Sequence, residues 1–254
     1  NNLIYCVSIE DNMIYAIDPE TGEVGTYLTE GPVGCAVLDQ KGMILEAEKS
    51  GIFRIDPRTK EKQLVAKAHD DERIRYNDGK LDPKGRLLVG TMGYDDTYEG
   101  KAALYAIEKD GTVRTVLDGL TLANGMGWSP DGKTLYFIDT PTKKVGSYAY
   151  DPETGEAIFE KYVIEITDGS NPDGMCVDME GMIWVAQYGG EKVCRWDPES
   201  GGKLEEIRMP VKKRFRRLSV RIRKHCSARP SPIRHLKCST LRNSPALPIV
   251  TVCL

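Results

Sequence analysis

Several common features are missing from this 254-residue sequence, and each absence narrows what the protein can be. No stretch approaches 18 consecutive apolar residues, so we expect no membrane-spanning helix. No basic segment followed by an apolar run stands at the N-terminus, so we expect no signal peptide in it. The seven Cys are odd in number and form no Cys-x-x-Cys pair, which argues against a disulfide framework and predicts a reducing, cytoplasmic location.

Helical and histidine-based features are also scarce. No window shows sustained apolar periodicity of 3.6 residues, so long amphipathic helices are not expected. Residues 1–211 contain one His, His69, and no clustered Cys, which excludes a metal site built from His or Cys ligands there. No Gly-x-Ser-x-Gly sequence accompanies His69, so a Ser-His-Asp triad is not expected either.

Charge and glycine content divide the chain into two parts. The net charge of −3 averages an acidic body, residues 1–211, with 23 basic and 38 acidic side chains, and a basic tail, residues 212–254. The tail has 12 Lys or Arg but no Asp, Glu or Gly, whereas all 25 Gly lie in the body. We therefore expect one globular domain over 1–211 and a separate, disordered or aberrant tail over 212–254.

Two sequence patterns alternate along the body. In the first pattern, a tight turn ends in Gly and a β-rich run follows. The turn glycines are Gly42, Gly85, Gly132 and Gly181, and they are separated by 43, 47 and 49 residues. In the second, a short strand runs into an acidic turn, as in Tyr15–Pro19, Phe53–Pro57, Tyr105–Glu108, Tyr148–Pro152 and Cys194–Pro198. A repeat of ~40–50 residues with about four short strands is typical of a β-propeller blade, with a sandwich or β-helix as the all-β alternatives.

The repeat phase also selects a set of polar side chains. The residues eight positions before the four turn glycines are Gly34, Asn77, Asn124 and Asp173. Equivalent residues on the innermost strands of a propeller converge on its axis, and oxygen donors of this kind suit Ca²⁺ or Mg²⁺. Arg75, two residues before Asn77, faces the same way on a strand. The alternative is that Asn or Asp before Gly serves only to form turns.

Three motifs give the body a family resemblance. They are Arg75–Arg86 (RYNDGKLDPKGR), Asn124–Ser129 (NGMGWS) and Pro172–Asp178 (PDGMCVD). From about Leu3 to Pro210 the chain resembles the senescence-marker-protein, gluconolactonase and luciferin-regenerating-enzyme family, which includes regucalcin. The resemblance implies a six-bladed β-propeller with one divalent metal at its axis. It implies hydrolysis of sugar lactones and, in some relatives, of other esters or organophosphates.

The resemblance also implies roles for individual residues. Asn124 and Asp173 would be metal ligands, with Asp173 also the general base. Arg75, Asn77 and Asp95 would bind the substrate, although Asp96 is an alternative to Asp95. Oxygen ligands make Ca²⁺ the first choice, with Zn²⁺, Mg²⁺ and Mn²⁺ as alternatives. The competing function is a non-catalytic propeller that binds a small molecule, calcium or a protein partner.

The chain departs from the family pattern at both ends. The family takes a further metal ligand from a Glu in an early Glu-Gly-Pro-x-Trp motif, whose position would precede Asn1, so we expect a truncated first blade. After Pro210 the family continues into a sixth blade, whereas here the basic tail replaces it. We therefore expect an incomplete six-bladed ring with exposed edges and reduced stability.

A change of reading frame near Lys213 is our first explanation of the tail. A basic tail that binds nucleic acid is the second explanation, which the acidic body disfavours. A third explanation, zinc binding, would use residues whose spacing matches no standard zinc finger: His225, Cys226, His235, Cys238 and Cys253. The small-molecule substrate is the only partner that we expect for the body.

Overall fold

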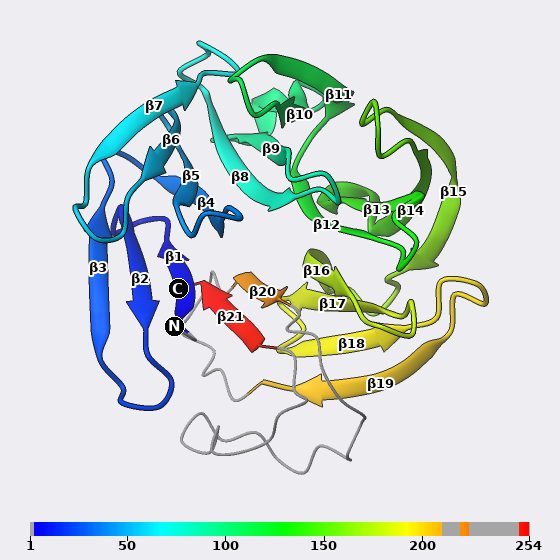
Figure 1. The fold of residues 1–254 in the computed structure, drawn as a ribbon. Coiled ribbons are helices and arrows are strands. Elements are labelled where there is room, and N and C mark those ends of the chain that lie inside the picture. Colours follow the sequence, from blue (N-terminus) through cyan, green and yellow to red (C-terminus); the bar gives the residue numbers. More distant parts are fainter. Residues whose placement is uncertain (1–2, 210–218, 224–248, 254) are drawn as a thin grey trace.

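The computed structural model describes residues 3–209, 219–223 and 249–253, the last two segments as backbone only. Five antiparallel sheets follow one another along the chain and stand around a common axis as the blades of a β-propeller (Figure 1). The protein is therefore all-β, as the repeats predicted. Neither described helix is long enough to cross a membrane, because both are single 3₁₀ turns, η1 (Asp96–Tyr98) and η2 (Thr140–Thr142).

The first blade has three strands and the next four blades have four each. Blade 1 contains β1 (Ile4–Ser8), β2 (Met13–Ile17) and β3 (Val24–Leu28). Blade 2 contains β4 (Val33–Leu38), β5 (Ile44–Glu48), β6 (Gly51–Ile55) and β7 (Lys62–Ala66). Blade 3 contains β8 (Ile74–Leu81), β9 (Leu87–Gly93), β10 (Ala102–Ile107) and β11 (Val113–Leu120). Blade 4 contains β12 (Ala123–Trp128), β13 (Thr134–Asp139), β14 (Lys144–Tyr150) and β15 (Ala157–Glu165). Blade 5 contains β16 (Asn171–Val177), β17 (Ile183–Tyr188), β18 (Lys192–Trp196) and β19 (Lys203–Arg208).

The described residues do not confirm the predicted count of six blades, since they build five. A two-stranded sheet, β20 (Ser219–Arg223) with β21 (Ile249–Cys253), stands between blade 5 and blade 1 (Figure 1). β20 lies next to β16 and β17, and β21 lies next to β1. Most of the predicted basic tail falls outside the described residues.

The first sequence pattern forms the turn between the two inner strands of a blade. In blades 2, 3 and 5 the side-chain oxygen Oδ1 of an Asp accepts hydrogen bonds from the amides two and four residues later; these are Asp39, Asp82 and Asp178. The Gly three residues after each Asp adopts φ between 76° and 84°, which only glycine reaches without strain. In blade 4 the Ser129 hydroxyl takes the place of the carboxylate and accepts from the Thr134 amide at 2.9 Å. The repeated Asp and Gly therefore encode the turns locally.

The apolar core lies between the blades. Four buried clusters each draw their side chains from two neighbouring blades. A fifth cluster differs, because its fully buried members among the described residues all come from blade 5: Cys176, Trp184, Ala186 and Val193. Successive blades, from blade 1 to blade 5, thus pack face to face. Blade 5 also has an apolar cluster, and β20 lies next to its two inner strands.

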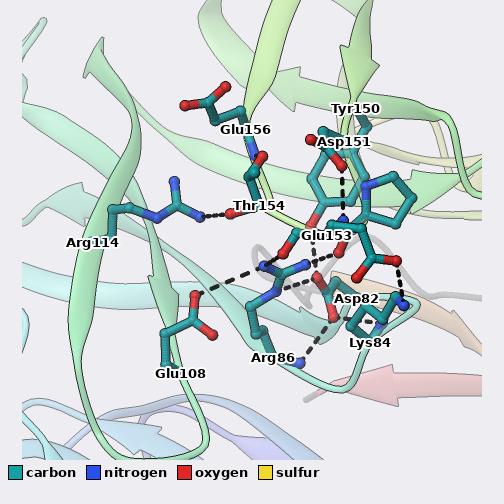
Figure 2. Close-up of polar contacts among 11 residues, drawn as sticks. Asp82, Lys84, Arg86, Glu108, Arg114, Tyr150, Asp151, Glu153, Thr154 and Glu156 are labelled. Carbon is teal, nitrogen blue, oxygen red and sulfur yellow. Dashed lines mark hydrogen bonds and ion pairs between the residues drawn. The ribbon is translucent and has the colours of Figure 1, made fainter.

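A buried polar cluster joins blades 3 and 4 (Figure 2). The Arg86 Nε lies 2.7 Å from Asp82 Oδ2, and the Tyr150 hydroxyl of blade 4 donates to the same oxygen at 2.7 Å. Arg86 also donates to the carbonyl oxygens of Pro152 and Glu153. Burial, followed by the bond to Asp82, raises the pKa of Tyr150. The turn after β14 is thereby held against blade 3.

Candidate functional site at the propeller axis

The innermost strands of blades 2 to 5, β4, β8, β12 and β16, share one irregularity (Figure 1). Each loses register with the second strand of its blade at the same point of the repeat. The residues left unpaired there include Gly34, Asn77, Asn124 and Asp173. These are β-bulges, which redirect side chains and are frequent beside active sites. The sequence repeat had identified these four positions, but not the bulges.

Glycines let the inner strands touch at the bulges. A Cβ on Gly34 would lie 2.4 Å from the Tyr76 carbonyl oxygen, and a Cβ on Gly125 would lie 2.4 Å from the Asp173 carbonyl oxygen. No side chain fits at such distances, so glycine is required for the close approach of backbones. The contact at Gly125 places Asn124, its chain neighbour, next to the backbone of Asp173.

Arg75 and Asn77 form one unit, as the sequence predicted from their spacing. The Arg75 Nη1 donates to Asn77 Oδ1 at 3.1 Å and to the Tyr76 carbonyl oxygen at 2.9 Å. The Asn77 Nδ2 donates to the Ala123 carbonyl oxygen at 2.9 Å, so this buried amide connects blade 3 to blade 4. These bonds orient the guanidinium, whose five N–H groups are of the kind that binds an oxygen of a ligand.

Asn124 is linked to β16, the strand that carries Asp173, through a residue that sequence reasoning missed. The Asn124 Nδ2 donates to Thr140 Oγ1 at 3.1 Å, and this hydroxyl donates to the Pro172 carbonyl oxygen at 2.8 Å. Because Nδ2 is engaged, Oδ1 is the Asn124 atom that remains for a cation. Asn124 and Asp173 are only 6% and 7% exposed. Thr140 lies outside the three motifs that carry the family resemblance, so the sequence did not single it out.

The donor types fit a hard divalent cation. A buried carboxylate and a buried amide oxygen, on adjacent strands, are the ligands that Ca²⁺ and Mg²⁺ prefer. Among the described residues, no group of three or more His, Cys, Asp and Glu is arranged so that it could hold a metal ion. Asn124 and Asp173 would therefore hold such an ion together with donors of another kind, such as carbonyl oxygens, water or the ligand itself.

Asp95 is placed differently from the other predicted residues. It is exposed on the loop between β9 and β10, where its Oδ1 accepts from the Thr97 amide at 2.9 Å and from the Thr97 hydroxyl. These bonds to Thr97, the side-chain bond first, hold the pKa of Asp95 below its usual value. Thr97, rather than Arg75 or Asn77, thus orients this carboxylate. Asp96, the alternative, begins η1.

A second residue that sequence reasoning missed is Lys80. Its ammonium donates to the Met126 carbonyl oxygen at 2.8 Å and to the Met175 carbonyl oxygen at 2.9 Å. One side chain of blade 3 therefore contacts the inner strands of blades 4 and 5. Nothing in the sequence distinguishes Lys80 from a solvated lysine, because its partners lie 46 and 95 residues further along the chain.

A family model, curated sequences and solved structures all show similarity of this chain to the same group of proteins. Residues 1–216 match the model of the SMP-30/Gluconolactonase/LRE-like region. Regucalcin of Xenopus laevis is 33% identical over 82% of this chain and 71% of its own. A putative sugar lactone lactonase of Bacillus subtilis is 31% identical over 84% of this chain and 73% of its own. The fold is also similar to that in the crystal structure of a calcium-binding protein, regucalcin from Agrobacterium tumefaciens, with a TM-score of 0.74. The two sequences are 27% identical, and the match covers 80% of this chain and 68% of that one.

Proposed function

Because the chain belongs to the SMP-30/gluconolactonase/LRE-like family, we propose that it is a divalent-metal-dependent hydrolase of sugar lactones. The observation that carries the proposal is the set of β-bulges that presents Asn77, Asn124 and Asp173 at equivalent points of adjacent inner strands. The relative from Bacillus subtilis, named a putative sugar lactone lactonase, supports the substrate class.

The proposed ligands of the cation are the Asp173 carboxylate and Asn124 Oδ1. A divalent cation at this place would supply polarisation of the lactone carbonyl and acidification of water. Ca²⁺ is our first choice because both donors are oxygens, and the calcium-binding regucalcin of Agrobacterium tumefaciens supports it. Mg²⁺, Mn²⁺ and Zn²⁺ are the alternatives that a titration must compare.

The side chains perform the remaining steps of the proposed reaction. The Asp173 carboxylate accepts a proton from the attacking water, whose oxygen bonds to the lactone carbonyl carbon. The bond from that carbon to the ring oxygen then breaks, and the ring oxygen takes up the proton to give an open hydroxy acid. Arg75 and Asn77 bind hydroxyl or carbonyl oxygens of the sugar, and Asp95 accepts hydrogen bonds from its hydroxyls.

Lactone hydrolysis after chelation and metal addition tests the proposal. We expect gluconolactone hydrolysis to stop with EDTA and to return with one of the four cations. Because general-base catalysis contributes about 10²–10⁴-fold, Asp173→Asn is expected to lose at least about 100-fold in kcat. Asp118→Asn, an exposed carboxylate on β11, is the matched control and is expected to keep full activity.

Two results of this assay contradict the proposal. Hydrolysis that persists in EDTA or in Asp173→Asn removes the metal and the general base from the mechanism. Saturable binding of calcium or lactone by the wild type without turnover instead identifies the competing function, a binding propeller without catalysis.

We also propose that the chain derives from a six-bladed ring whose last blade is replaced by residues 212–254. The blade 5 cluster supports this, since the other four clusters each need two blades. The tail would arise from a change of reading frame near Lys213. Sequencing the coding DNA across that codon tests the idea: a glycine-containing blade in another frame supports it, and a confirmed frame with no such blade overturns it.

We place the protein in the cytoplasm, with a small-molecule lactone as its partner and no role in nucleic-acid binding. The seven Cys of the sequence are odd in number and form no Cys-x-x-Cys pair, which supports a reducing compartment. Fractionation of the source cells tests the location, and recovery in an oxidising compartment would contradict it.

A further inference from the structure

Lys80 occupies an unusual position for a cation. It lies near the end of β8, in the blade that supplies Arg75 and Asn77, but its ammonium bonds to carbonyl oxygens of β12 and β16. The two residues that supply these oxygens, Met126 and Met175, are at most 2% exposed. Blades 3, 4 and 5 therefore meet at one ammonium.

The two carbonyl oxygens stand at equivalent places in the repeat. Met126 and Met175 are the first residues that regain strand pairing after the bulges, with Phe137 and Val185 as their partners. Each lies two residues after a proposed metal ligand, Asn124 or Asp173. An innermost strand has no strand on its axial side, so carbonyl groups directed there need another donor. Lys80 supplies that donor for both strands.

We propose that Lys80 is a positioning residue that sets the distance between the two bulges and hence between Asn124 and Asp173. This inference rests on the proposed function in one respect only, namely that the distance between Asn124 and Asp173 determines the affinity for the metal. Its structural part rests on the two hydrogen bonds and on the register shifts beside them. A bulge is a local break in the ladder, so its geometry depends on contacts outside the sheet. The tether from blade 3 provides such a contact to both bulges at once.

Hydrogen exchange of the full-length, metal-free protein tests the structural part. Lys80→Met keeps an unbranched side chain that is one atom shorter and removes the three N–H donors. We expect amide exchange to accelerate about tenfold in peptides covering 123–128 and 171–177, and to remain unchanged in blade 2. Lys80→Arg, which can still donate to both carbonyls, is expected to restore part of the protection.

Lys60→Met is the matched control. The Lys60 ammonium also donates to a carbonyl oxygen of a neighbouring blade, that of Thr26 at 3.4 Å, but on the exposed outer side. This variant is expected to leave exchange at both bulges unchanged. Unaltered exchange in Lys80→Met overturns the proposal. Equal acceleration in all five blades also overturns it, because Lys80 would then be a general stabiliser.

Calcium titration by calorimetry tests the consequence. We expect Lys80→Met to raise the Kd about tenfold, equivalent to about 1.4 kcal/mol, and Lys60→Met to leave it unchanged. An unchanged Kd in Lys80→Met overturns the link to the metal site while the proposed function stands. A wild type that neither binds a divalent cation nor hydrolyses lactones overturns the proposed function, and hydrogen exchange still decides the role of Lys80.

Discussion

Two fully buried carboxylates in blade 2 share one ammonium. The Lys62 Nζ lies 2.9 Å from Glu46 Oε1 and 2.8 Å from Glu48 Oε2, and both glutamates are inaccessible to solvent. Burial raises the pKa of Glu46 to about 7; Lys62 opposes this shift, and Glu48 and Glu30 add to it. Although burial opposes it, bonding to both carboxylates raises the pKa of Lys62, which therefore stays charged. The three groups thus have excess negative charge once Glu46 loses its proton.

Glu46 is therefore expected to make folding stability depend on pH. Its pKa of about 7 in the folded protein exceeds the ordinary value of 4.5, so the folded state binds the proton more tightly and folding stability falls as pH rises from 4.5 to 7. Glu46→Gln removes this loss. Relative to wild type, its free energy of unfolding should increase between pH 5 and pH 8, by about 3 kcal/mol at most.

Urea unfolding at both pH values measures this difference. The exposed Glu156→Gln serves as the control and should show the pH dependence of the wild type. A pH dependence in Glu46→Gln that equals the wild type's would show that the Glu46 carboxyl titrates normally.

The strands and turns follow from short patterns, whereas the bulges do not. The Asp or Ser and the Gly of each inner turn act within six residues of chain, so β5, β9, β13 and β17 each begin two residues after the turn glycine. A bulge instead depends on how one inner strand meets the next blade. At Gly125 this contact leaves no room for a Cβ.

Gly125→Ala is expected to separate β12 from β16 and to destabilise the protein by about 1–3 kcal/mol. The added Cβ would meet the Asp173 carbonyl oxygen at 2.4 Å and the Met175 amide nitrogen at 2.7 Å, neither of which is a flexible side-chain end. Gly25→Ala in β3 is the control, because its Cβ would make only ordinary contacts at 3.8 Å, and it should change stability by less than about 0.5 kcal/mol. Equal unfolding midpoints for both variants in guanidinium chloride would contradict the close contact.

At the scale of the whole molecule, ring closure depends on what covers blade 5. Its apolar face includes Trp184, which is only 7% exposed, and β20 lies beside the two inner strands of this blade. The sequence indicated a break in composition at residue 212, but not that a segment after it would lie against blade 5. Neighbouring blades bury their faces against each other, so an uncovered face would weaken the ring.

Deleting residues 211–254 is therefore expected to lower the thermal midpoint and to expose the face of blade 5. Tryptophan emission should shift to longer wavelength, and binding of the dye ANS should increase. The full-length chain measured in the same buffer is the reference. An unchanged emission spectrum and midpoint would show that the tail contributes nothing to this face.

The sequence by itself determined the blades, because turn residues and strand patterns act over a few residues and recur at the period of a propeller. It also indicated three polar residues in one phase of that repeat, Asn77, Asn124 and Asp173, which lie at equivalent β-bulges of the inner strands. Only the tertiary structure decided how they are held: the bulges, the Thr140 bridge and the Lys80 tether join residues from different blades. Asp95 differs from these residues, because Thr97, two positions later in the same loop, determines its hydrogen bonds. Contacts between segments that are distant in the chain leave no local pattern, and the geometry of the site depends on them.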